Sequence, residues 1–202
     1  MMESTGGGPL PPGARFVEYL ESTGTQWIDT GLTFDVSSVV DIELGITPTA
    51  TASGDAFFYG MENLSAGNFG LELFRTDFYF AAGSKEQNLG AATIGARYDF
   101  LAHYESGNSW IKTNGTTTAT LTNAFTRISN LSLLLFSRQT TTAQNASKAK
   151  IDSFKVYKNN VLVRDFAPIA IGTTGYMLDL VSGEYLPYGN VGTGDFTIGP
   201  DK

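Results

Sequence analysis

Short segments in which apolar and polar residues alternate recur along this 202-residue chain, and turn residues separate them. Alternation with a period of two places the two sets of side chains on opposite faces of a β-strand. The clearest case is residues 37–47, SSVVDIELGIT, in which every second residue from position 40 onward is Val, Ile or Leu. No segment has a convincing helical pattern. Residues 122–128 could form at most one or two helical turns. The pattern predicts an all-β protein.

The other predicted strands show the same alternation or a short apolar run, and turn residues follow most of them. They are residues 55–60, 68–74, 77–82, 97–105, 109–113, 116–121, 131–136, 150–157, 161–166, 176–181, 184–186 and 195–198. Asn114 and Gly115 form the strongest hairpin signal, because both residue types tolerate the positive φ angles of a type I′ turn. Many short strands with turns at regular spacing predict a two-sheet antiparallel sandwich of the jelly-roll type.

Length and composition set the expected domain organisation. A chain of 202 residues can bury a single core without covalent cross-links. Residues 1–14, MMESTGGGPLPPGA, are rich in Gly and Pro, which predicts a flexible lead before a single domain of residues 15–202. The chain has no cysteine, so disulfides, thiolate metal ligands and thiol nucleophiles are excluded.

The charge and hydropathy patterns narrow the class of partner. The net charge is −7 and the Lys and Arg residues are scattered, which argues against nucleic acid, whose phosphates need clustered cations. No apolar run reaches the roughly 18 residues that a spanning helix needs, so membrane insertion is not expected. The N-terminus lacks the pattern of a signal peptide. Export would then occur as part of a particle, by lysis, or with a signal that has already been removed.

Residues 16–31, FVEYLESTGTQWIDTG, indicate a strand, a Ser-Thr-Gly turn and a second strand. Residues 16–21 and 25–30 both alternate, and Gly24 can adopt a positive φ at no steric cost. The local pattern leaves two arrangements open, a hairpin or two strands joined by a corner.

The string EYLESTGTQWIDTG, together with the Pro-rich stretch before it, resembles the opening motif of a laminin-G-like, concanavalin A-like jelly-roll domain. Such domains recur in gut bacterial surface proteins and in bacteriophage tail or receptor-binding proteins. Residues 154–198 resemble the closing signature of the same family, with matches at Arg164, Asp165, Phe166, Pro168, Asp179, Gly183, Gly192, Gly194 and Phe196. The resemblance implies a single jelly roll whose first and last strands are neighbours.

Candidate catalytic groups are few. Asp41 and Glu43 share a strand face, but no third acid follows to complete the spaced run of carboxylates expected of a retaining glycoside hydrolase. His103 is the only histidine, and no Gly-x-Ser-x-Gly motif lies near it. We therefore predict no catalytic residues and no enzymatic activity, with a glycoside hydrolase as the less favoured alternative.

The residues themselves predict no cofactor. Transition-metal sites are not expected in a chain with one His and no Cys. The family resemblance keeps calcium open, because related domains bind it through Asp, Asn and backbone carbonyls from separate loops. Asp55, Asn63 and Asp195 are each better explained as polar residues at loop tips.

A carbohydrate-binding surface is the remaining functional prediction. Proteins bind sugars with flat aromatic rings and hydrogen-bonding side chains on a rigid scaffold. The candidates are Arg75, Tyr79, His103, Trp110 and Arg138, which could meet on one sheet. The alternative for each is ordinary packing, as we expect for Trp27.

The family resemblance thus implies a non-catalytic binding or adhesion module that recognises surface carbohydrate, on a phage tail or fibre or on a bacterial cell surface. The expected partners are a glycan or another host cell-surface ligand, together with other chains of a larger assembly. The alternative is a structural virion or surface module that makes protein-protein contacts. Either role is extracellular or virion-associated.

Overall fold

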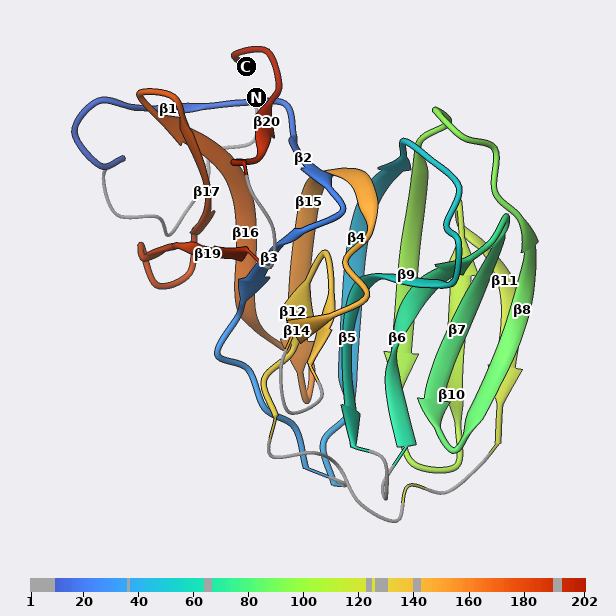
Figure 1. Cartoon of the computed structure of the whole chain (residues 1–202). Coiled ribbons are helices and arrows are strands. Elements are labelled where there is room, and N and C mark those ends of the chain that lie inside the picture. Colours follow the sequence, from blue (N-terminus) through green and yellow to red (C-terminus); the bar gives the residue numbers. More distant parts are fainter. Residues whose placement is uncertain are drawn as a thin grey trace.

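Two β-sheets pack face to face in the computed structural model, which describes residues 10–35, 37–63, 67–122, 125, 131–139, 143–190 and 194–202 (Figure 1). Sheet I contains β1 (Ala14–Phe16), β2 (Leu20–Thr23), β4 (Val40–Pro48), β9 (Tyr98–Tyr104), β10 (Ser109–Thr113), β11 (Thr116–Leu121), β15 (Lys148–Lys158), β16 (Val161–Ile171), β17 (Thr174–Asp179), β18 (Tyr185–Leu186) and β20 (Thr197–Ile198). Sheet II contains β3 (Gln26–Asp29), β5 (Asp55–Asn63), β6 (Gly67–Phe74), β7 (Asp77–Gly83), β8 (Lys85–Ala91), β12 (Leu134–Leu135), β13 (Arg138–Gln139), β14 (Ala143–Gln144) and β19 (Tyr188–Asn190). The predicted all-β, two-sheet class is confirmed.

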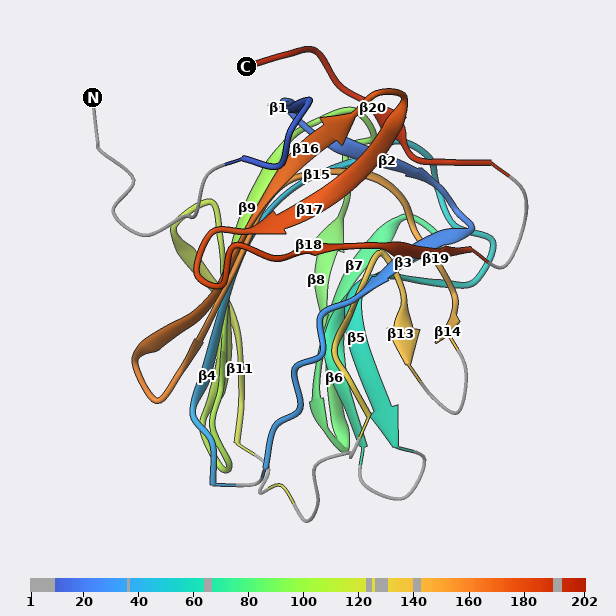
Figure 2. The same cartoon turned by 90° about the vertical axis from the view of Figure 1, so that its left-hand side faces the viewer.

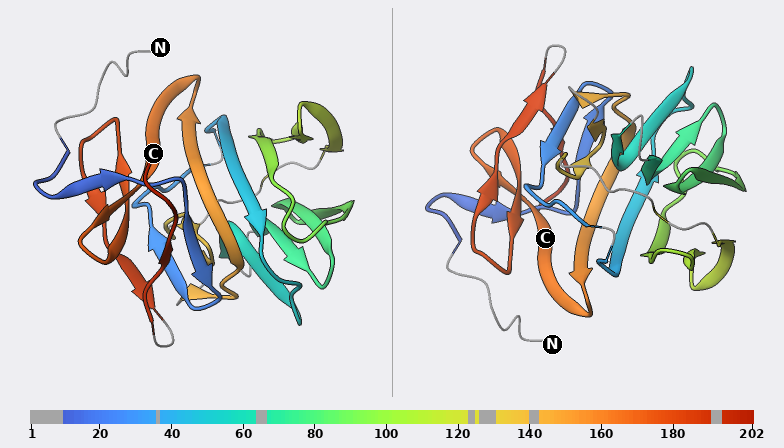
Figure 3. Two further views of the ribbon diagram at one scale, coloured as in Figure 1. Left: turned by 90° about the horizontal axis from the view of Figure 1, so that it is seen from above. Right: turned by 90° about the horizontal axis from the view of Figure 1, so that it is seen from below.

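The chain passes repeatedly between the sheets, for example from β4 to β5 and from β8 to β9, as in a jelly roll. The strand order is β11-β10-β9-β4-β15-β16-β17-β18 along sheet I and β19-β3-β12-β5-β6-β7-β8 along sheet II. These neighbours pair antiparallel, whereas β13 pairs parallel with β5. Viewed from above and below, β17 to β19 lie at one end of the sandwich, and β8, β10 and β11 lie at the other (Figure 3).

The opening segment forms a corner between the sheets and not a hairpin. Strand β2 pairs with β15 and β20 in sheet I, while β3 pairs with β12 and β19 in sheet II. The strand predicted for residues 16–21 is interrupted, because β1 ends at Phe16 and β2 begins at Leu20. One short segment therefore contributes strands to both layers of the sandwich.

The two ends of the described chain lie together, as the family resemblance implied. Strand β1 pairs with β16, β2 pairs with β20, and Val17 forms an isolated bridge with Asp201. Arg15 Nε also donates to Asp201 Oδ1 at 2.6 Å. The opening and closing signatures consequently belong to one continuous part of sheet I.

The core lies between the sheets and follows the predicted alternation. Val40, Ile42 and Leu44 of β4 are buried. The hydroxyl groups of Tyr59 in β5 and Tyr104 in β9 hydrogen-bond at 2.8 Å, which links sheet II to sheet I inside the core. Burial raises the pKa of both hydroxyls, so each stays protonated and one donates to the other.

Several expectations differ from the structure. Strands β8 and β19 were not predicted, since the sequence of β8, KEQNLGA, shows no apolar alternation. Of the apolar run 131–136, strand β12 covers Leu134 and Leu135, and Phe136 adopts a φ of 62°.

Other expectations lie partly outside the described residues, namely much of residues 122–128 and residues 1–9 of the predicted lead. The division into a lead and one domain stays a prediction. Among the described residues, no helix has the length and apolar character needed to cross a membrane.

Candidate functional site

The five predicted sugar-binding residues do not meet on one sheet, so that expectation is wrong. His103 lies on β9 and Trp110 on β10 of sheet I. Tyr79 lies on β7 and Arg138 on β13 of sheet II, and Arg75 occupies the turn between β6 and β7. The structure therefore offers two separate outward-facing surfaces.

On sheet I, three side chains form a row across neighbouring strands. Trp110 is registered opposite His103, and His103 is registered opposite Asp41 of β4. The His103 and Trp110 rings stack with centroids 4.9 Å apart and planes 11° apart, and Lys112 Nζ lies 5.0 Å from the Trp110 ring centre. His103 Nδ1 lies 2.7 Å from Asp41 Oδ1, and Nε2 lies 3.6 Å from Glu105 Oε2. These contacts fix the orientation of Trp110, which is half-buried.

A surface hollow of about 250 Å³ adjoins this row. Its lining includes Glu43, Asp99, Leu101, Lys112, Gly115 and Ser153. Lys112 belongs both to the hollow and to the Trp110 contact, so the aromatic pair and the polar side chains form one continuous surface. A flat ring beside several donors and acceptors is suited to a hydroxyl-rich ligand. The sequence alone did not indicate that Glu43 and Asp99 belong to this surface.

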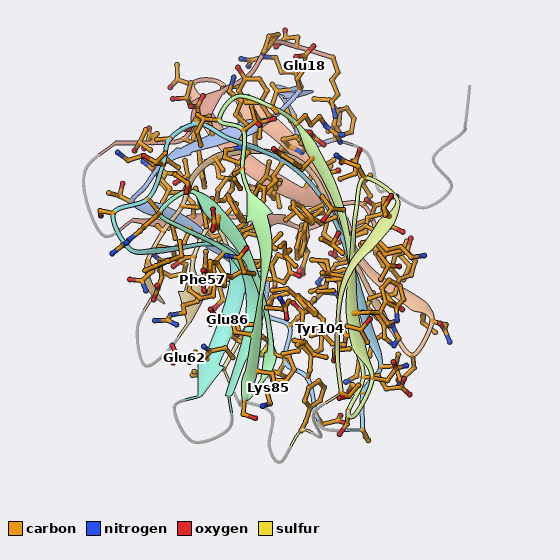
Figure 4. All side chains as sticks on the ribbon, turned by 90° about the vertical axis from the view of Figure 1, so that its right-hand side faces the viewer. Glu18, Phe57, Glu62, Lys85, Glu86 and Tyr104 are labelled. Atoms are coloured by element: carbon orange, nitrogen blue, oxygen red, sulfur yellow. The ribbon has the colours of Figure 1, made fainter. Side chains whose placement is uncertain are left out.

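On sheet II, Arg138 covers a ring that lies flat on the sheet. Its guanidinium carbon lies 4.7 Å from the Phe57 ring centre, and its Nη1 lies 2.6 Å from Glu62 Oε2. Gly60 leaves room for this arrangement, because a Cβ there would lie 2.8 Å from Phe57 Cδ1 and 2.9 Å from Arg138 Cβ. Phe57, Glu62 and Glu86 point away from sheet I (Figure 4). Arg138 is thus held in an ion pair, and its side chain is only 14% exposed.

Glu72, beside this cluster, is a buried carboxyl group. It is 4% exposed, and its Oε2 atom has no hydrogen-bond partner within the described parts of the chain. Burial, followed by the nearby charges of Asp55 and Glu86, raises the pKa of Glu72 to about 8, while Arg138 opposes the shift. The carboxyl group is therefore largely protonated at neutral pH.

Tyr79 and Arg75 meet through Phe74 at one end of sheet II. The Tyr79 and Phe74 rings contact edge to face with centroids 6.1 Å apart, and the Arg75 guanidinium lies 5.3 Å from the Phe74 ring centre. Asn88 Nδ2 donates to the Tyr79 hydroxyl at 3.0 Å and to Asp77 Oδ2 at 2.9 Å. This arrangement orders Tyr79 and is also what ordinary packing on a sheet surface produces.

The β4–β5 connection and the turn between β2 and β3 lie side by side (Figure 2). A cavity that the sequence did not predict is lined by residues of both segments. Its volume is about 320 Å³, and the segment that leads into β15 completes its wall. The polar side chains that line it include Thr51, Ser53, Asp55, Ser147 and Lys148. These residues come from two stretches that are far apart in the sequence, and no local pattern indicates that the stretches meet.

The acidic side chains of the described residues do not support a calcium-binding site. Within the described ranges, no group of three His, Cys, Asp or Glu side chains is arranged to hold a metal ion. Asp195 accepts a hydrogen bond from the Tyr188 hydroxyl, which raises the pKa of Tyr188 to about 12. Asp55 lies 3.8 Å from the Arg138 guanidinium and lines the cavity.

Comparison with known proteins supports the fold. No protein-family model and no curated protein matches the sequence. Among solved structures, a "putative carbohydrate binding protein" from Bacteroides ovatus aligns with a TM-score of 0.65 and 13% identity, over 92% of this chain and 60% of that one. Trypanosoma rangeli sialidase aligns with a TM-score of 0.53 and 11% identity, over 74% of this chain and 27% of that one. This chain thus spans less than two thirds of either protein.

The strand pairing and the similarity to the Bacteroides ovatus structure together define this protein as a β-sandwich of the jelly-roll class. More particularly, it is a two-sheet antiparallel jelly roll, which is the fold that the resemblance of the opening and closing signatures implied. At such low identity the similarity establishes the fold alone, and function has to be argued from the sites.

Proposed function

We propose that this protein is a non-catalytic carbohydrate-binding module and that the outer face of sheet I holds the glycan. The observation that carries the proposal is the row of Trp110, His103 and Asp41 beside the polar hollow. A sugar ring packs its C–H face on the exposed part of Trp110, and its hydroxyl groups reach Glu43 and Lys112. The name of the Bacteroides ovatus protein agrees with this ligand class.

The same row supports binding and not catalysis. His103 lies against Asp41 through Nδ1 and stacks on Trp110, so in this proposal the Asp-His pair positions an aromatic ring. His103 Nε2 faces Glu105 at 3.6 Å. We therefore assign no catalytic residue.

The outer surfaces of sheet I and sheet II are both candidates for the glycan-binding site, and single substitutions distinguish between them. Trp110→Ala removes the platform on sheet I, and Tyr79→Ala is the matched aromatic truncation on sheet II. We expect Trp110→Ala to weaken glycan binding about tenfold or more, and Tyr79→Ala to leave it unchanged. The reverse result would place the site at Arg75, Tyr79 and Arg138, the part of the original prediction that lies on sheet II.

A glycan array, probed in calcium and again in a chelator, identifies the ligand and tests the calcium dependence. Binding to no glycan under either condition would refute the carbohydrate proposal and favour the structural module that contacts other protein chains. We further propose that the module acts on a bacterial cell surface or a phage tail, outside the cell or on a virion. The sequence resemblance supports this location.

A further inference from the structure

We propose that the cavity between the β4–β5 connection and the segment before β15 is a second binding site, which takes a small neutral polyol such as a single sugar ring. It shares no lining residue with the hollow on sheet I, and the inference does not depend on glycan binding there. Its volume of about 320 Å³ lies within the range of small-ligand sites.

The first argument is an unpaired hydroxyl group in the wall. Ser147 is 1% exposed, and its Oγ atom has no hydrogen-bond partner among the residues that the structure describes. Buried polar groups are almost always paired, so such an atom in the wall of a cavity indicates a ligand or water. One bridging water needs only about 10–15 Å³, and the cavity far exceeds this requirement.

The second argument is that backbone hydrogen bonds hold the walls in place. Ser147 N donates to the Phe136 carbonyl at 2.8 Å, and Phe57 N donates to the Asn145 carbonyl at 2.8 Å. Thr49 N donates to the Lys148 carbonyl at 3.0 Å, which ties the two walls together, and Ala52 N in the β4–β5 connection donates to the Arg75 carbonyl at 3.0 Å. The cavity is therefore formed before a ligand arrives, which lowers the ordering cost of binding.

The third argument concerns charge and fixes the ligand class. Asp55 and Lys148 both line the cavity, so an anionic ligand meets a carboxylate and a cationic ligand meets an ammonium group. A neutral polyol avoids both penalties, because its hydroxyl groups donate to Asp55 and accept from Lys148. Thr51 and Ser53 add exposed hydroxyl groups, while the half-buried Ala52 and Ala146 offer apolar surface for the C–H side of a sugar ring.

The test is an amide NMR titration of the full chain with glucose, galactose and mannose. We expect saturable shifts confined to residues 50–56 and 146–148. Ser147→Ala should weaken the binding about fivefold, because it removes one hydrogen bond, and Thr51→Trp, at an exposed position, should abolish it by filling the mouth. Trp110→Ala is the matched control and should leave the cavity shifts unchanged.

Charged sugars of the same ring size test the selectivity. Glucuronate and glucosamine should bind more weakly than the neutral hexoses, with Asp55→Asn improving glucuronate and Lys148→Met improving glucosamine. No saturable shift with any of the three hexoses would overturn the inference, as would equal affinity for the charged sugars. Binding lost in Trp110→Ala but retained in Ser147→Ala would assign the sugar to sheet I. That result would overturn the cavity site and leave the proposed function intact.

Discussion

The side chain of Gln26 in the opening segment donates from Nε2 to the main-chain carbonyl of Gly194 in the closing signature at 3.0 Å, across 168 positions of sequence. Gln26 is fully buried, and its Oε1 accepts a hydrogen bond from Thr23 N at 2.8 Å. The opening segment is thus joined to the end of the chain by a side chain as well as by strand pairing. The two recognisable stretches of sequence act as one structural unit.

Replacing Gln26 should destabilise the whole domain. Gln26→Ala removes the hydrogen bonds that the buried Gln26 side chain makes with Thr23 N and the Gly194 carbonyl and opens a small cavity, so we expect a loss of about 2–4 kcal/mol in the free energy of unfolding. Urea denaturation followed by tryptophan fluorescence measures it. Gln87→Ala, at an exposed position, is the control and should change stability by less than about 0.5 kcal/mol.

Asp179 should have a structural role of similar size. It is 1% exposed and accepts hydrogen bonds from Asp165 N at 3.0 Å, Val181 N at 3.1 Å and Ser182 Oγ at 2.7 Å. Asp179→Asn keeps one acceptor oxygen for the two backbone N–H groups but turns an amide donor toward Ser182 Oγ and the Arg164 guanidinium, so we expect a loss of about 2–4 kcal/mol by the same denaturation assay. The exposed neighbour substitution Glu184→Gln should be neutral, and equal stability of both variants would contradict this role.

Glu72 should make stability depend on pH. Its pKa is about 8 in the folded protein against a usual value of 4.5, so the folded state binds the proton more tightly than the unfolded state. Stability from this group is therefore present at low pH and is lost as the pH rises from 4.5 to about 8. The charged groups that influence the pKa of Glu72 are Asp55, Glu62, Glu86 and Arg138.

Glu72→Gln imitates the protonated form and isolates this effect. At about pH 5 the variant and the original protein should be equally stable, and at about pH 9 the variant should be more stable by about 1–3 kcal/mol. Thermal unfolding followed by circular dichroism across this range provides the measurement. Parallel pH profiles for the two proteins would show that the Glu72 carboxyl group is not buried in solution.

Asp41 should affect binding through His103. Asp41→Asn weakens the contact that orients the His103 ring and hence the Trp110 platform, so we expect glycan affinity to fall about three- to fivefold. Isothermal titration with the best ligand from the array measures the affinity. Asp77→Asn on sheet II is the control, and equal affinities for both variants would show that Asp41 does not position the platform.

Much of the candidate site could not be inferred from the sequence. Trp110 and His103 were identified because aromatic residues on predicted strands are suited to sugars, and their pairing follows from the register of β9 and β10. Arg138 was selected for its charge, yet the fold places it in an ion pair with Glu62. Ser147 carried no signal, because a serine in a polar stretch is expected to be solvated. Its burial depends on residues that are distant in sequence.

The sequence by itself determined the positions of most strands and the class of the fold. Alternation with a period of two predicted β4, β6, β7, β9 and β15, and the Asn114-Gly115 turn appears with φ angles of 49° and 82°. These signals are local, since side-chain direction and turn geometry depend on adjacent residues.

Only the tertiary structure decided which strands became neighbours. It turned residues 16–31 into a corner, divided the predicted sugar-binding residues between two sheets, buried Glu72 and closed a cavity around Ser147. Each of these outcomes depends on contacts between segments that are far apart in the chain, and a periodic pattern within one segment carries no information about its partner.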